Sequence, residues 1–158
     1  MAKVMNGRFT ANMDEPFAVF MIGMRINNFL AVGKWLPTVR AMGPMLRELY
    51  KHPEKGFLGA DFFLHLRGPM LVQYWHSFED LERFAKNPDD PHLPAWRRFN
   101  QKVGSDGSVG VWHETYTIKP GTFEAIYVNM PPLGLAKATE HVPAVGRQKT
   151  ARKRLMRE

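Results

Sequence analysis

The sequence predicts an α+β fold: a ferredoxin-like β-α-β-β-α-β antiparallel sheet with an extra strand, which pairs with a second copy to form a dimeric α/β barrel. Two observations support this. Short segments rich in aromatic and β-branched residues alternate with segments of helical apolar spacing, in the order of the split βαβ arrangement. Such a sheet has helices on one face only. The second face is also apolar here, so we expect a homodimer that covers it.

The first predicted strand covers residues 17–26 (FAVFMIGMRI), where both alternating faces are largely apolar, as a strand covered on both sides requires. Residues 34–51 then show the apolar spacing of a helix, and Pro44 predicts a kink or break near Gly43. Further strands are predicted at residues 57–66, 70–76, 108–119 and 123–130.

Two more helices are expected on the same side of the sheet. Ser77 is a candidate N-cap, and Asp80 three residues later approximates a capping box. Another helix is predicted at about residues 92–103, where Trp96 and Phe99 are three positions apart. The order of elements is therefore that of a ferredoxin-like unit.

Length and composition exclude several classes of protein. A chain of 158 residues with 44% hydrophobic and 23% charged residues can bury one substantial core. It has no cysteine, which excludes disulfides, thiolate zinc sites and cysteine nucleophiles. Its longest strongly apolar run, residues 17–24, is too short for a membrane span, and no apolar signal region is seen near residue 1. We expect a cytoplasmic protein.

The positive charge is concentrated at the C-terminal end. The formal net charge is +7, and residues 147–158 account for +5 of it. We expect residues 1–138 to form the folded domain and residues 139–158 to be a basic, disordered tail that folding does not need. Such a tail can attract polyanions, but no specific nucleic-acid recognition is predicted.

Several polar residues interrupt the apolar strands, and these are the candidates for a site. We interpret His113 as a general base, with Arg25 or Asn129 stabilising an oxyanion. Alternatively, His113 is a hydrogen-bonded core or interface residue. The aromatic residues expected to bind a small-molecule substrate are Trp75, Trp112, Tyr116 and Tyr127.

Metal and nucleotide sites receive little support. His92 lies at a predicted helix start, where it is either a haem ligand or an ordinary surface residue. The sequence contains no HxH, HxxxH or HExxH pairing, so no dedicated metal site is predicted. It also contains no GxGxxG, GxxxxGK[ST] or GxSxG motif.

Taken together, several segments resemble those of a known family. They are GMRIN at residues 23–27, KWLP at 34–37, YWHSFEDL at 74–81, WHETY at 112–116 and NMP at 129–131. Over roughly residues 10–138 the chain resembles the family named after a fumagillin-pathway monooxygenase, in the dimeric α/β barrel superfamily. The resemblance implies that fold and a monooxygenase-like activity.

The passage from strand to helix at residues 75–81 is also similar to haem-degrading and haem-dependent dehydratase barrels. In the haem-degrading proteins an axial histidine follows an alanine, whereas here Ala95 is followed by Trp96.

The favoured hypothesis is an oxidoreductase, a cofactor-independent monooxygenase acting on a small aromatic or phenolic substrate. The alternatives are a haem-binding barrel protein and a non-enzymatic module that binds a small ligand.

Overall fold

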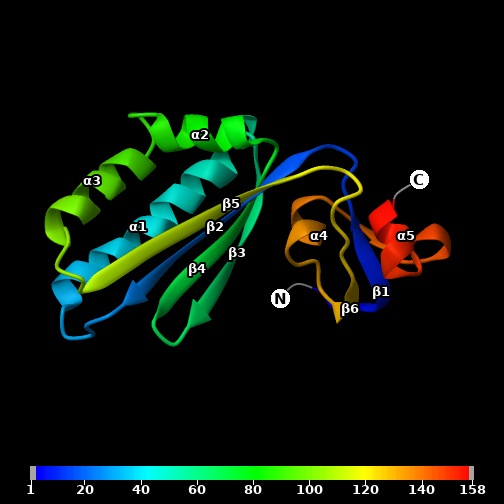
Figure 1. Cartoon of the computed structure of the whole chain (residues 1–158), viewed down its shortest axis with the longest axis horizontal. Helices are drawn as coiled ribbons and strands as arrows, with labels where there is room; N and C mark the ends of the chain where they lie inside the picture. Colours follow the sequence, from blue (N-terminus) through cyan, green and yellow to red (C-terminus); the bar gives the residue numbers. More distant parts are fainter. Residues whose placement is uncertain (1–2, 157–158) are drawn as a thin grey trace.

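The computed structural model describes residues 3–156 and contains a four-stranded and a three-stranded sheet (Figure 1). The strands are β1 (Met5–Asn12), β2 (Phe17–Ile26), β3 (Phe57–His65), β4 (Gly68–Trp75), β5 (Val109–Ile118), β6 (Tyr127–Met130) and β7 (Glu140–Pro143). The helices are α1 (Val32–Lys51), α2 (Phe78–Lys86), α3 (His92–Lys102), α4 (Leu135–Ala138) and α5 (Ala151–Met156), with short 3-10 turns η1 (Pro53–Lys55) and η2 (Gly146–Gln148).

The larger sheet has the ferredoxin-like strand order β3-β4-β2-β5, and all neighbouring strands are antiparallel. Strand β2 lies inside the sheet, with Ile22 opposite Leu71 of β4 and opposite His113 of β5. This position explains why residues 17–26 are apolar on both faces. The predicted fold class is confirmed for this part of the chain.

Helices α1, α2 and α3 cover one face of this sheet (Figure 1). The main core lies between them, where Ala18, Leu49, Trp75, Leu81 and Phe84 are buried together. Their burial removes apolar side chains from water, which favours folding by roughly 1.5–3 kcal/mol for each large residue. The helices therefore pack on the sheet face that carries Ala18 and Trp75.

The predicted cap of α2 is confirmed. The backbone N–H of Asp80 donates to Ser77 Oγ at 3.1 Å, and Ser77 Oγ donates to the Asp80 carboxylate at 2.9 Å. These contacts satisfy one of the free N–H groups at the helix start.

The predicted break near Gly43 is wrong, because α1 continues through Pro44 to Lys51. Proline removes the bond to the carbonyl four residues earlier, which belongs to Arg40. Arg40 is exposed, so water can hydrate that carbonyl. Packing of Leu46 and Leu49 on the core then outweighs the loss of one helical bond.

The smaller sheet differs from the prediction. Its order is β6-β1-β7, and its central strand β1 was not predicted from the sequence. The expected strand at residues 123–130 is limited to β6, which pairs with β1 rather than extending the larger sheet. Strand β1 has two edges whose backbone N–H and C=O groups need partners. One edge pairs with β6 and the other with β7, which is why β6 joins this sheet.

Residues 139–156 also differ from the expected disordered tail. Residues 140–143 form β7 against β1, and Arg154 of α5 is buried with only 4% of its surface exposed. The Arg154 guanidinium donates to the Glu124 carboxylate at 2.9 Å and to the carbonyl of Gln148 at 2.9 Å. Residues 157 and 158 lie outside the described part of the chain. The boundary at residue 138 stays a prediction.

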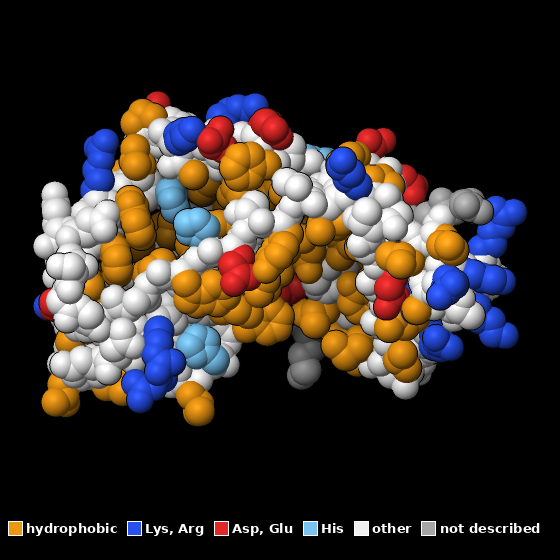
Figure 2. All heavy atoms as spheres, viewed as in Figure 1, with side chains coloured by type: hydrophobic (Ala, Val, Ile, Leu, Met, Phe, Trp, Pro, Cys, Tyr) orange, Lys and Arg blue, Asp and Glu red, His pale blue; other side chains and the backbone are white. Residues whose placement is uncertain are grey.

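The sheet face opposite α1–α3 is covered only in part. Near one end, Leu135 and Ala136 of α4 pack with Phe17, Val19 and Tyr74. Farther along, Phe63 and Tyr116 are 41% and 49% exposed, and Figure 2 shows hydrophobic side chains gathered there. The dimeric barrel therefore stays a prediction. Within residues 3–156, no helix is long and apolar enough to cross a membrane.

Candidate functional site

A cavity of about 830 Å³ lies between the helix-covered face of the larger sheet and helices α1, α2 and α3. Its walls are mainly apolar and include Phe20 and Ile22 of β2, Leu46 of α1, Leu71 of β4 and Phe99 of α3. This volume lies within the range of sites that bind small organic molecules. The ferredoxin-like unit therefore contains a binding-sized space.

Two histidines from separate elements line this cavity. His113 lies on β5 opposite Ile22, which places its side chain on the helix-covered face of the sheet. His92 is the first residue of α3. The His113 ring lies 5.6 Å from the Phe20 ring, and the His92 ring lies 6.0 Å from the Phe84 ring. Figure 2 shows histidine side chains in a hollow bordered by hydrophobic groups.

The surroundings of His92 favour a neutral imidazole. Burial lowers the pKa of His92, and the charge of nearby His113 lowers it further. Both effects disfavour the protonated ring, because a buried charge loses hydration and a like charge repels it. At neutral pH, His92 can therefore accept a proton or ligate a metal atom.

Gln73 adds a hydrogen-bonding group to the cavity wall. The Trp75 indole N–H donates to Gln73 Oε1 at 3.0 Å, which fixes the orientation of the Gln73 side chain. Gln73 lines the cavity, and its amide NH₂ is the group left to donate once Oε1 accepts from Trp75. Such a donor can stabilise negative charge on a bound oxygen.

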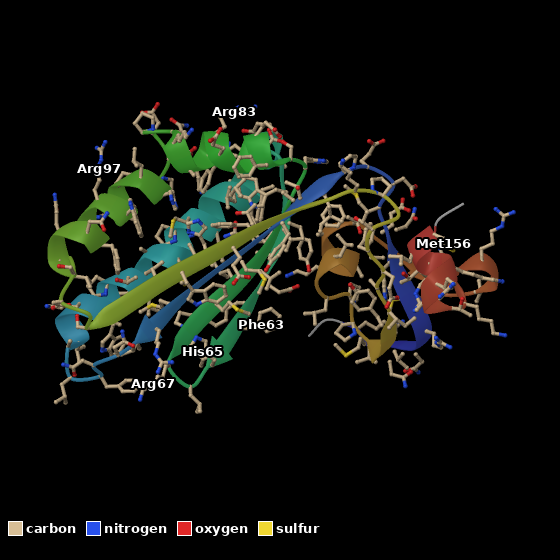
Figure 3. All side chains as sticks on the ribbon, viewed as in Figure 1. Phe63, His65, Arg67, Arg83, Arg97 and Met156 are labelled. Atoms are coloured by element: carbon tan, nitrogen blue, oxygen red, sulfur yellow. The ribbon has the colours of Figure 1, made fainter. Side chains whose placement is uncertain are left out.

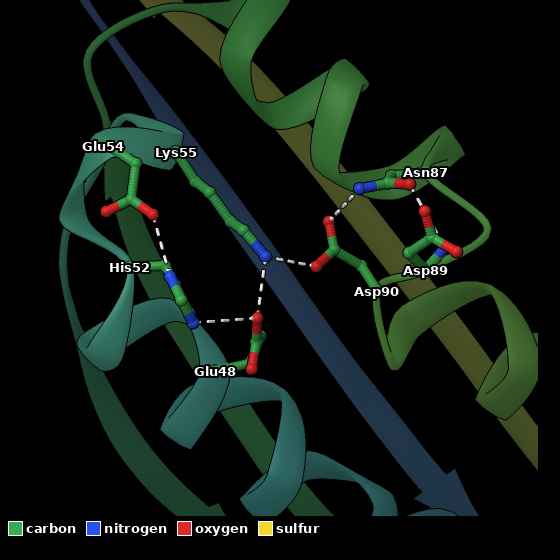
Figure 4. A network of polar contacts seen from close by, with 7 residues as sticks. All are labelled: Glu48, His52, Glu54, Lys55, Asn87, Asp89 and Asp90. Atoms are coloured by element: carbon green, nitrogen blue, oxygen red, sulfur yellow. Dashed lines mark hydrogen bonds and ion pairs between the residues drawn. The ribbon is translucent and has the colours of Figure 1, made fainter.

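A network of polar contacts holds the start of α3 (Figure 4). Lys55 Nζ donates to Glu48 of α1 at 2.8 Å and pairs with Asp90, whose side chain is 4% exposed. Asn87 also donates to Asp90, at 2.9 Å. Burial alone lowers the pKa of Lys55, but the hydrogen bonds to Asp90 and Glu48 raise it overall. Because Asp90 lies two residues before His92, this network positions that histidine.

The structure places three of the predicted site residues on the opposite face of the sheet. Trp112 lies over Gly23, where an added Cβ would be 2.7 Å from the indole nitrogen. The Tyr116 hydroxyl donates to Glu114 at 2.6 Å, and Arg25 donates to Asn27 at 3.0 Å. Within the single chain these residues lie on the other side of the sheet from His113.

Two further predicted residues lie in the smaller sheet. Asn129 has a φ of 52° and accepts a bond from the Gly7 N–H at 2.9 Å. The Tyr127 hydroxyl accepts from the Ala136 N–H at 3.3 Å. Burial raises the pKa of Tyr127 and raises that of neighbouring Tyr74 to about 12. The first contact joins β6 to β1, and the second joins β6 to α4.

Trp75, the remaining predicted residue, is completely buried in the core beside the cavity. The cavity therefore contains His113 and His92, while the other predicted residues lie elsewhere. The inner face of α1, with Met42 and Met45, was not predicted as a cavity wall. Its apolar helical spacing looks the same whether the helix faces packed atoms or an open space.

Comparison with known proteins finds a matching family, a curated relative and solved structures of similar fold. The family described as monooxygenase af470-like matches residues 17–135. The chain is 29% identical to monooxygenase af470 of Aspergillus fumigatus, in an alignment covering 87% of this chain and 56% of that protein. The chain thus spans about half the length of that curated relative.

Two solved structures of aldoxime dehydratases share the fold. One, OxdRE in complex with butyraldoxime, has a TM-score of 0.65 and 17% identity, and the match covers 80% of this chain and 38% of that one. The second has a TM-score of 0.61 and 20% identity, covering 82% and 40%.

Proposed function

The chain belongs to the monooxygenase af470-like family, and from this we propose that it is an oxidoreductase, a cofactor-independent monooxygenase that oxidises a small aromatic or phenolic substrate in the cavity between helices and sheet. The observation that carries the proposal is the convergence of His92 and His113 on one mainly apolar cavity of about 830 Å³. Titratable groups in an apolar cavity are typical of catalytic sites.

In this proposal, His113 removes a proton from an activated C–H or O–H group of the substrate. The resulting carbanion or phenolate transfers electrons to dioxygen. For an activated CH₂ group the balance is one CH₂ and one O₂ giving one C=O and one water. Gln73 donates to the oxygen that carries negative charge, in place of Arg25 or Asn129, which lie outside the cavity. Neutral His92 accepts the second proton, and the two histidines return their protons to the oxygen atom that leaves as water.

Oxygen uptake by metal-free protein, measured with a panel of phenols and quinols, tests this proposal. His113→Ala is expected to lower kcat by about 100-fold or more, the usual contribution of a general base. His65→Ala is the matched control, because His65 lies on the opposite face of the sheet (Figure 3). Ligand binding without oxygen uptake across the panel would contradict the oxygenase proposal and favour a non-enzymatic binding module.

A haem-binding function is the second candidate, because His92 is a half-buried, neutral imidazole on the cavity wall. These properties fit an axial ligand, so His92 is the residue that would hold the iron. Bound haem would supply the redox or Lewis-acid chemistry. Reconstitution with haemin tests this: a Soret band that His92→Ala abolishes and His65→Ala retains would support haem, and no band would exclude it.

A further inference from the structure

The charged residues around the cavity are unbalanced in sign. Four cationic side chains line it, against one acidic side chain, Glu82. Glu82 is already paired with Lys86 at 2.7 Å, and Lys34 is paired with Asp106. The other three cationic residues are Arg40, Arg98 and Lys102. Within residues 3–156, none of these three has an ion-pair partner.

These unpaired cations lie along the neighbouring walls formed by α1 and α3. The two helices run in opposite directions, so that α1 begins near the end of α3 (Figure 1). The Lys34–Asp106 pair joins those ends. Arg40 comes six residues after Lys34 on α1, about 9 Å along the helix, and Arg98 comes four residues before the end of α3 at Lys102, about 6 Å along that helix. Arg40 lies in the first half of α1 and Arg98 in the second half of α3, so both lie toward the end of the cavity that the Lys34–Asp106 pair joins.

We propose, on the basis of the proposed function, that the substrate is an organic acid with an apolar body. Its carboxylate is bound by Arg40 and Arg98, whose planar guanidinium groups match a carboxylate with two parallel hydrogen bonds. Its body lies against Met42 and Met45, which line the same cavity. The two arginines thus recognise the charge of the acid, and the two methionines contact its apolar body.

The position of His92 sets the length of this acid. His92 and Arg98 are six residues apart on α3, which corresponds to about 9 Å along the helix. The reacting atom, near the histidines, is therefore separated from the carboxylate by a spacer of similar length. An aromatic ring joined to a carboxylate by a short chain has these dimensions.

A matched pair of probes tests the inference. 4-Phenylbutyrate and 4-phenyl-1-butanol have the same body and differ in charge. Titrations followed by NMR of ¹³C-methyl methionine report where each binds, because Met42 and Met45 line the cavity and Met70 lies on the opposite face of the sheet. The acid is expected to bind about tenfold tighter than the alcohol, as one charged hydrogen bond provides, and to shift Met42 and Met45 only.

Charge variants identify the anion-binding residues. Arg40→Gln and Arg98→Gln are each expected to weaken the binding of the acid by about threefold or more. Each should change the affinity for the alcohol by less than about twofold. Arg97→Gln is the control, because Arg97 points away from the cavity (Figure 3) and is expected to change neither. Equal affinities for the two probes, or no effect of either variant on the acid, would overturn the inference while leaving the cavity as the site of the proposed oxygenase.

If neither probe shifts Met42 or Met45, the cavity itself is not a ligand site and the proposed function fails as well. Haemin is also an apolar body with carboxylates, so its binding is distinguished by the Soret band and by His92→Ala. Tight binding of haemin with no binding of the acid would overturn the inference in favour of haem.

Discussion

The charge state of His92 gives a prediction at the scale of a single residue. Burial lowers its pKa below the ordinary value of 6.5, so the unfolded chain binds more protons than the folded chain as the pH falls through that value. Stability associated with His92 is therefore present above pH 6.5 and is lost as the pH falls toward the folded-state pKa. Urea unfolding at pH 7.5 and 5.5 should show a smaller pH effect in His92→Gln than in the wild type.

The same histidine offers a direct check by NMR. Its ring proton should titrate with a midpoint below 6.5, and His113→Ala should move that midpoint upward, because the like charge of His113 is one cause of the shift. An unshifted midpoint in the wild type would contradict the buried position of His92. His65→Ala serves as the control, because His65 lies on the other face of the sheet.

Gly23 gives a second prediction at this scale. A Cβ at Gly23 would lie 2.7 Å from the Trp112 indole nitrogen, so Gly23→Ala must displace the ring. We expect a loss of about 1–3 kcal/mol in the free energy of unfolding, together with a change in tryptophan fluorescence. Gly110→Ala, where the nearest atom is at 3.8 Å, should have a clearly smaller effect. Equal losses would show that Trp112 does not pack on Gly23.

At the scale of elements, the network around Lys55 joins α1, η1 and the start of α3 (Figure 4). Asp90→Asn removes one of the two charges that pair with Lys55 and is expected to destabilise the fold by about 1.5 kcal/mol or more, the contribution of a hydrogen bond to a charged group. Backbone hydrogen exchange at the first turn of α3 should also become faster. Glu54→Gln is the control, because its contact with His52 is exposed and should contribute little to stability.

The C-terminal elements lead to a different expectation from that of a dispensable tail. A chain ending at Ala138 loses β7, which pairs with β1, and Arg154, which pairs with Glu124. We expect its melting temperature to fall by several degrees, because about 1 kcal/mol shifts Tm by about 2–4 °C in a domain of this size. Arg152→Gln, on the exposed side of α5, should leave Tm unchanged. An unchanged Tm on truncation would restore the interpretation as a tail.

The elements show which features the sequence makes visible. The strands and helices of the larger sheet could be predicted, because each has a strong apolar period and clear turn signals. Strand β1 (MNGRFTAN) is mostly polar, so no such period marks it. The pairing of β6 with β1, separated by more than a hundred residues, depends on tertiary contacts that local patterns do not contain.

The candidate site was predicted only in part for a related reason. Alternation along β5 puts His113 on one face and Trp112, Glu114 and Tyr116 on the other. This separation could be predicted from the sequence. The pattern does not say which face the helices cover, since both faces of this sheet are rich in apolar residues. The structure shows that the helices cover the face that carries His113, so Trp112 and Tyr116 lie outside the cavity.

For the whole molecule, the exposed sheet face predicts association of two copies. Phe63, Met70, Val72 and Trp112 lie on this face, beyond the part that α4 covers. Burial of such an apolar surface against a second copy favours a two-fold homodimer. Sedimentation at micromolar concentration should give twice the chain mass of 18.2 kDa.

A charge on this face separates dimerisation from folding. Phe63→Glu, at a position 41% exposed in the single chain, should yield a folded monomer, because a carboxylate buried between two sheets loses its hydration. Leu30→Glu is the matched control: Leu30 is 92% exposed in the turn before α1, away from this face, and the change should leave the dimer intact. A wild-type chain that sediments as a monomer would contradict the dimer. Equal dissociation by both variants would place the contact elsewhere on the molecule.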